Sequence, residues 1–301
     1  MSAGKDHSFV GISPEHCFEE LFTAVQTSGL LADSKTFVDA IPQADPATIL
    51  ARYRQEKQTA GFDLGEFVEQ NFQLPPPAGR GVSADPARPV ECYIDELWDT
   101  LTRVDGDATR WSTLIELPEP YIVPGGRFRE IYYWDSYFSM LGLAEAGRVH
   151  QIEQMIVNFA YLIDTVGFVP NGNRHYFRSR SQPPFFALMV ELLAEQTSDE
   201  QVLIRFLPQL EAEYEFWMRP GSARAVVIDG ESYNRYWDDA TTPRPESYAE
   251  DLVLANASTR PATELCREIR AACESGWDFS SRWLEEPQSM DSIRTTRVLP
   301  V

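Results

Sequence analysis

Residues 170–184 form a polar loop between two amphipathic stretches, and they read Pro170-Asn-Gly-Asn-Arg-His-Tyr-Phe-Arg-Ser-Arg-Ser-Gln-Pro-Pro184. The apolar residues before the loop fall on one stripe of a helix: Ile152, Met155, Ile156, Phe159 and Ile163. Those after it do the same: Phe186, Met189, Val190 and Leu193. Alternation typical of strands is sparse along the chain. We therefore predict an all-α fold of helical hairpins joined by long polar loops.

Local signals place the remaining elements. Pro14 and Pro261 each suit the first turn of a helix, and Pro208 should kink or split the helix that contains it. Ser198 with Gln201 predicts a capping box. Residues 225–228, followed by Asp-Gly, predict one arm of a small hairpin.

Two regions are predicted from the position of a Pro- and Gly-rich linker at 74–81. Residues 1–84 form an N-terminal helical arm with this linker. Residues 85–301 form the second region, where polar loops between helices carry the unusual residues.

Composition narrows the classes of partner. With 26 Lys and Arg against 46 Asp and Glu, the formal charge is −20, which disfavours nucleic acid and anionic membranes. The longest apolar run, 185–190, is too short to span a bilayer. The four cysteines show no Cys-x-x-Cys spacing, so we expect reduced thiols and no metal site. Because residues 1–7 lack an apolar signal-peptide core, we expect a cytoplasmic protein.

The richest segment for chemistry is Pro124-Gly-Gly-Arg-Phe-Arg-Glu-Ile-Tyr-Tyr-Trp-Asp-Ser-Tyr137. Its glycines allow a tight turn, Arg127 offers a fork of donors, Trp134 a flat apolar face and Asp135 an acceptor pair. Such a set suits a sugar. The alternative is structural, with Trp134 in the core and Asp135 capping a helix.

Three further segments carry candidates with structural alternatives. In the loop 170–184, hydroxyls can be bound by Asn171, Arg174, Arg180 and Gln182, although a solvated loop would look the same. His175 is more typical of a surface histidine than of a base. Prolines 243 and 245 stiffen Arg244 and Glu246, while Ser247 with Glu250 could form a capping box.

The last segment is Glu274-Ser-Gly-Trp-Asp-Phe-Ser-Ser-Arg-Trp283. A carboxyl at Asp278 held against an aromatic wall would have a raised pKa, as a general acid needs. Alternatively, Gly276 ends one helix and Asp278 caps the next element.

The pattern Pro-Gly-Gly-Arg-Phe-x-Glu-x-Tyr-x-Trp-Asp at 124–135 resembles the first signature of the trehalase family. The resemblance continues through Asn171-Gly-Asn-Arg, Arg180-Ser-Gln-Pro-Pro-Phe-Phe, Asn234-Arg-Tyr-Trp-Asp-Asp, Pro243-Arg-Pro-Glu-Ser and Ser275-Gly-Trp-Asp. It implies an (α/α)6 toroid and hydrolysis of α,α-trehalose to two glucoses with inversion, without a cofactor. It also implies a monomer at full length. The chain is similar to the cytoplasmic bacterial form of the family.

By matching motif, the resemblance implies Asp278 as the general acid. It also implies a set of substrate-contacting positions: Arg127, Phe128, Trp134, Asp135, Asn171, Arg180, Ser181, Gln182, Arg244, Pro245, Glu246 and Gly276. The three arginines among them would gather around the reacting glucose.

One part of the family pattern is missing. The second signature, Gln-Trp-Asp-x-Pro-x-Gly-Trp, and the downstream glutamate that activates water do not occur in the 301 residues. Inverting enzymes need two carboxyls roughly 6.5–9.5 Å apart. We therefore expect a toroid incomplete on its C-terminal side, with exposed apolar faces, low stability and no activity alone. The alternatives are a noncatalytic disaccharide binder, a decayed gene product, or a toroid glycosidase for another disaccharide.

Overall fold

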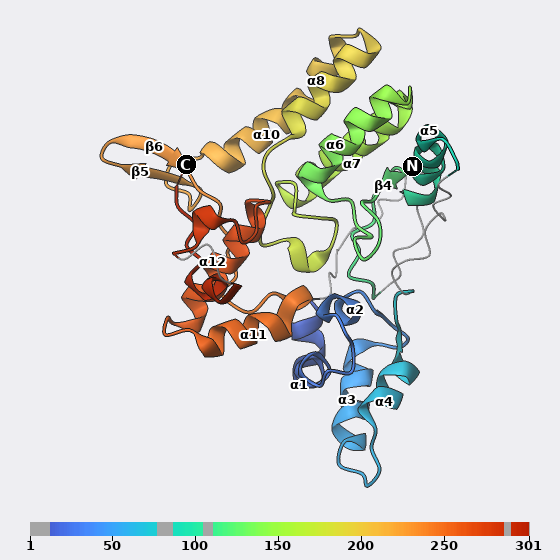
Figure 1. Ribbon diagram of the computed structural model, residues 1–301, viewed down its shortest axis with the longest axis vertical. Coiled ribbons are helices and arrows are strands. Elements are labelled where there is room, and N and C mark those ends of the chain that lie inside the picture. Colours follow the sequence, from blue (N-terminus) through green and yellow to red (C-terminus); the bar gives the residue numbers. More distant parts are fainter. Residues whose placement is uncertain (1–12, 77–86, 105–110, 286–289, 301) are drawn as a thin grey trace, which may run out of the picture.

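The computed structural model describes residues 13–76, 87–104, 111–285 and 290–300. Most of these residues are helical, which confirms the all-α class. Three helical pairs follow one another: α6 (Tyr133–Glu145) with α7 (Val149–Val166), α8 (Phe186–Thr197) with α10 (Leu207–Met218), and α11 (Tyr248–Ala257) with α12 (Ala262–Glu274). Figure 1 shows the first two pairs side by side and the third below them. This succession of helical pairs agrees with the expected toroid.

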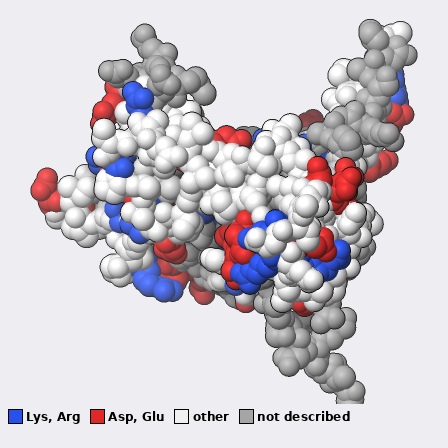
Figure 2. Space-filling view, turned by 90° about the horizontal axis from the view of Figure 1, so that it is seen from below, with Lys and Arg blue, Asp and Glu red and all other residues white. Residues whose placement is uncertain are grey.

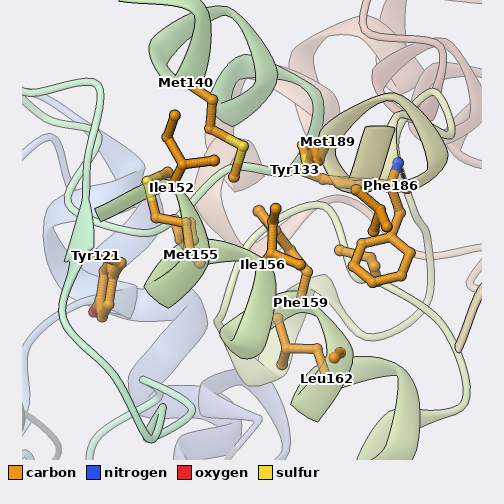
Figure 3. Close-up of a cluster of buried hydrophobic side chains, with 14 of the residues drawn as sticks. Tyr121, Tyr133, Met140, Ile152, Met155, Ile156, Phe159, Leu162, Phe186 and Met189 are labelled. Carbon is orange, nitrogen blue, oxygen red and sulfur yellow. Dashed lines mark hydrogen bonds between the residues drawn. The ribbon is translucent and has the colours of Figure 1, made fainter. Parts of the chain in front are cut away.

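The main core lies between the first two pairs. Ile156 and Phe159 of α7 face Phe186 and Met189 of α8, and all four side chains are buried (Figure 3). The apolar stripe predicted for residues 152–163 is the buried face of α7, which ends at Gly167 in the left-handed conformation (φ 93°).

The N-terminal arm contains α1 (Pro14–Thr27), α2 (Ser34–Val38), α3 (Pro46–Glu56) and α4 (Leu64–Asn71). The two-residue strands β1 (Ile41–Pro42) and β2 (Phe72–Gln73) pair antiparallel beside them. The arm lies next to α11 in Figure 1, where Phe22 and Tyr248 meet edge to face with ring centroids 5.0 Å apart. Most of the predicted linker, residues 77–81, and the predicted boundary at residue 84 lie outside the described residues.

The other elements are short. Helix α5 (Val90–Leu101) leads into β3 (Thr102–Arg103), which pairs with β4 (Tyr121–Ile122). The hairpin of β5 (Ala225–Ile228) and β6 (Glu231–Asn234) confirms the predicted turn, and Pro208 separates α9 (Gln201–Arg205) from α10. Single 3-10 turns occur at η1 (His175–Phe177), η2 (Pro245–Ser247) and η3 (Ser281–Trp283), and a longer 3-10 segment at η4 (Met290–Thr295).

Two capping predictions were wrong. Ser198 ends α8 in the left-handed conformation (φ 53°), and Asp199, not Ser198, accepts a hydrogen bond from the backbone N–H of Gln201. Ser247 precedes α11 without a side-chain cap, and Glu250 accepts from Ser34 of the arm instead. At Ser198 the adjacent Asp199 takes the capping role, whereas at Ser247 a tertiary contact to Ser34 engages Glu250.

The surface carries mixed charge and some apolar patches. Figure 2 shows basic and acidic side chains beside one another on the face seen from below. Several apolar side chains of α6, α8 and α10 are exposed: Phe138, Leu141, Leu188, Leu207, Tyr214 and Met218. A cavity of about 540 Å³ opens between α8, α10 and the β5–β6 hairpin. None of the described helices is long and apolar enough to cross a bilayer.

Candidate active site

A polar cavity of about 340 Å³ brings together residues that are far apart in sequence. Eleven of the thirteen predicted site residues line it: Arg127, Phe128, Trp134, Asp135, Asn171, Arg180, Gln182, Arg244, Glu246, Gly276 and Asp278. The cavity thus collects side chains from four loops, each at the end of a helix. The roles of these residues stay predictions.

The first wall of the cavity is the turn before α6. Gly125 and Gly126 have φ values of 99° and 62°, which favour glycine, and the backbone groups of Gly125 and Phe128 exchange hydrogen bonds of 3.1 and 3.0 Å. This tight turn carries Arg127 and Phe128, and the guanidinium of Arg127 lies 5.6 Å from the centre of the Phe128 ring. The turn therefore presents a cation and an aromatic face to the cavity.

The second wall is the start of α6 together with the loop before α8. The side-chain oxygen of Gln182 accepts from the backbone N–H of Trp134 at 3.2 Å. Asp135 is in the first turn of α6, and burial raises the pKa of its carboxyl. Trp134 packs edge to face with Phe138 and Phe185, with ring centroids 6.0 Å apart in both cases. The alternative that Trp134 is only a core residue does not fit, because its ring lines the cavity.

Buried ion pairs hold the two inner arginines. Arg180 is 1% exposed and donates to Glu246 at 2.7 Å, with Asp238 at 3.5 Å from its other terminal nitrogen. Arg244 donates to Asp251 at 2.6 Å and to the sulfur of Cys273 at 3.0 Å. Although burial alone would raise it, the pKa of Glu246 is lowered by the positive charges of the arginines around it. These pairs fix the donors in place before any ligand arrives.

Asp278 stands at the end of this charge network. Burial raises the pKa of its carboxyl, while Arg244 and Arg180 act in the opposite direction. The neighbouring Trp277 does not bury this carboxyl, since its side chain is 51% exposed and stacks on Arg282. The backbone φ of Asp278 is 28°, a strained value for a residue with a side chain.

Gly276 allows the segment that carries Asp278 to pack against the start of α6. Its φ is 67°, and a Cβ atom at this position would lie 2.6 Å from the indole of Trp134. Only glycine lets the Trp134 ring approach the backbone beside Asp278 this closely. The two motifs at 134–135 and 276–278 are therefore in direct contact.

Two predicted site residues, Ser181 and Pro245, do not line the cavity. The hydroxyl of Ser181 donates to the carbonyl of Val169 at 2.6 Å, and the carbonyl of Pro245 accepts from Gln26 at 2.9 Å. Both residues therefore make hydrogen bonds within the protein and do not face the cavity. They adjoin Arg180 and Arg244, so their motif positions reflect the loop conformation.

Six further residues line the cavity that were not predicted from the sequence as part of the site: Lys35, Pro124, Tyr132, Phe177, Ser247 and Cys273. Five of them are within or next to quoted motifs, so their position was a usable signal. Lys35 comes from the arm and no local pattern marks it. His175 does not line this cavity, and burial together with Arg178 and Arg174 lowers its pKa to about 4.

No cluster of three or more His, Cys, Asp or Glu residues with metal-binding geometry occurs within the described ranges. The four cysteines are free thiols, and two of them, Cys266 and Cys273, are buried.

Comparison with known proteins identifies the family. The sequence model of the trehalase family, described as Trehalase, matches residues 29–301. The chain belongs to the trehalase family. A periplasmic trehalase of Salmonella choleraesuis (strain SC-B67) is 51% identical over 305 residues, which cover 96% of this chain and 52% of that protein. A periplasmic trehalase of Escherichia coli (strain SMS-3-5 / SECEC) is 50% identical over 298 residues, with the same coverage.

Among solved structures, the neutral trehalase Nth1 from Saccharomyces cerevisiae matches with a TM-score of 0.46 and 29% identity. That match covers 54% of this chain and 34% of the yeast chain. The chain spans about half the length of the curated relatives it matches.

These relatives overturn one prediction. A cytoplasmic location was expected, but the relatives at 50–51% identity are named periplasmic trehalases. The expectation rested on residues 1–7, which lie outside the described residues. Net charge and free thiols do not distinguish the two compartments, so the remaining sequence held no compensating signal.

Proposed function

We propose that this chain supplies the acid side and a glucose-binding subsite of an α,α-trehalose hydrolase that inverts configuration. The observation that carries the proposal is the cavity, where Asp278 lies together with three arginines and the indole of Trp134. The guanidinium groups can bridge neighbouring hydroxyls and the indole can cover the apolar face of a pyranose. A neutral, soluble disaccharide also suits a protein with a formal charge of −20.

The proposed reaction uses Asp278 in its protonated form. Its carboxyl donates a proton to the glycosidic oxygen while that oxygen leaves the anomeric carbon. A water molecule attacks the opposite face of this carbon and loses a proton to a general base, giving one glucose of inverted and one of retained configuration. The raised pKa of Asp278 favours the protonated acid.

The general base is proposed to come from outside these 301 residues. Of the cavity carboxyls besides Asp278, Glu246 is held by Arg180 at 2.7 Å, which leaves it poorly placed to accept a proton from water. Asp135 belongs to the same loop–helix junction as Trp134 and is assigned to hydroxyl binding. The curated relatives are about twice as long as this chain, which is consistent with a base elsewhere in the complete site.

A second candidate is binding of trehalose without turnover. The observation that favours it is the preorganised set of donors, which needs no base to hold a sugar.

From the names of the relatives we also propose a periplasmic location.

The test combines binding and turnover in the same protein. Calorimetry should detect trehalose binding to the purified chain, and glucose should be released only when the remaining half of a relative is added. Asp278→Asn should abolish this release and leave binding largely intact, and the rate should fall as the pH rises through the raised pKa of Asp278. Asp99→Asn is the matched control, because Asp99 follows Trp98 as Asp278 follows Trp277 but is exposed and paired with Arg148. Full turnover by Asp278→Asn would refute the acid assignment.

A further inference from the structure

Arg127 needs an external partner to hold its guanidinium in one place. It stands on the glycine turn, its side chain is 45% exposed, and its neighbours in the turn are Gly126 and Phe128. An exposed arginine samples many rotamers, and each must be given up when the side chain binds a ligand. A fixed partner that orders the side chain in advance removes part of that cost.

Asp33 of the N-terminal arm is that partner. Its Oδ1 atom accepts a hydrogen bond from Nη2 of Arg127 at 2.9 Å, across 94 positions of sequence. The same oxygen accepts from the backbone N–H of Lys35 at 2.8 Å and so caps α2. One carboxylate oxygen thus ties a helix start to a cavity residue.

The helix that carries this carboxylate is itself firmly anchored. Lys35 of α2 is 3% exposed and pairs with Glu130 at 2.9 Å and Asp39 at 2.5 Å. Gln26 of α1 donates to the carbonyl of Ser34 at 3.0 Å and to that of Pro245 at 2.9 Å. The start of α2 is therefore connected to two of the three loops that carry candidate sugar-binding arginines, those of Arg127 and Arg244.

We propose that Asp33 is a positioning residue that pre-orients Arg127 for the sugar. The proposal rests on the proposed function and extends the site into the N-terminal arm, whose Lys35 also lines the cavity. It assigns to the arm a contribution to affinity beyond its own packing.

The competing interpretation is that Asp33 only caps α2 and forms an ordinary surface ion pair. Exposed pairs contribute little to folding stability. Asparagine is as good an N-cap as aspartate, so Asp33→Asn keeps the capping acceptor and removes the charge that holds Arg127. A cap-only role predicts unchanged trehalose affinity in this variant, and a positioning role predicts weaker affinity.

The first experiment is trehalose titration of the full chain by calorimetry. Asp33→Asn should weaken binding about three- to tenfold, the size expected for ordering one flexible side chain on binding. Asp45→Asn is the matched control, since Asp45 caps α3 through Ala47 and Thr48 and does not line the cavity. It should bind like wild type, and both variants should melt at nearly the wild-type temperature. In an Arg127→Lys background, Asp33→Asn should have little further effect.

A second readout does not depend on sugar. The Nε–Hε signal of Arg127 in a ¹⁵N NMR spectrum, assigned by its loss in Arg127→Lys, should shift and broaden in Asp33→Asn but not in Asp45→Asn. If wild type binds no trehalose, the proposed function fails and this signal alone decides whether Asp33 holds Arg127. An unchanged Arg127 signal, or unchanged affinity in Asp33→Asn, overturns the proposal.

Discussion

Gly276→Ala should destabilise the protein and damage the sugar site together. The new Cβ would lie 2.6 Å from Cε2 and 2.7 Å from Cζ2 of Trp134, closer than real Cβ contacts. The left-handed backbone (φ 67°) costs about 1–2 kcal/mol for a residue with a side chain. Displacing a packed indole adds roughly 1–3 kcal/mol. The free energy of unfolding should therefore fall by about 2–5 kcal/mol, measured by urea denaturation.

Gly147→Ala separates the two contributions. Gly147 has a φ of 68°, nearly that of Gly276, but a Cβ there would meet nothing within 4 Å. This control should lose only the backbone cost of about 1–2 kcal/mol and keep trehalose affinity. Trp134→Phe in the Gly276→Ala background should recover part of the lost stability, because phenylalanine lacks the atoms that clash. Equal losses for the two alanine variants would refute the claim that the indole contact sets the size of the effect.

Two further predictions concern buried carboxyls. Burial raises the pKa of Glu213 to about 7 in the folded state, so its contribution to stability is full below the unfolded value near 4.5 and is lost as the pH rises through 7. The free energy of unfolding of the wild type should fall by up to roughly 3 kcal/mol as the pH rises over this range. Glu213→Gln, which can still pair with the Tyr133 hydroxyl, should not show this dependence on pH. Equal pH dependence of the two proteins would contradict the assignment. Glu274→Ala should cost about 3–5 kcal/mol, because it leaves buried Arg224 without its carboxylate partner at 3.0 Å. Glu153→Ala, which breaks an exposed pair, should cost less than about 1 kcal/mol in the same urea assay, and similar losses would contradict the role of burial.

The helices were predicted well from the sequence because apolar periodicity, glycine and proline act within a few residues of their own position. The apolar stripe of α7 and the glycine at 167 mark the buried face and the end of the same helix. Pro208 separates α9 from α10 because it cannot occupy a helix interior. Ser198 failed as a cap because the chain uses it to end α8, and spacing to Gln201 alone does not reveal which helix it serves.

The candidate site was predicted mainly from the loops that resemble family motifs. Most of those residues line one cavity, yet the contributions of Asp33 and Lys35 were not foreseen. Asp33 meets Arg127 across 94 positions and Lys35 meets Glu130 across 95, and no period or capping signal encodes contacts at this separation. The expected aromatic wall near Asp278 is also not supplied by its neighbour in sequence, because Trp277 is 51% exposed, while the indole of Trp134, far away in sequence, packs against Gly276.

The bond from Gln26 to the carbonyl of Pro245 spans 219 positions and has a consequence for biosynthesis. A ribosome adds about 5–20 residues per second, so the second partner emerges roughly 10–40 s after the first. Throughout that interval Phe22 has no Tyr248 to pack against, and the amide of Gln26 has no second acceptor. The arm is made first, yet it can dock in its final position only after the loop at 245 has been synthesised, and during that interval its docking face is open to chaperones.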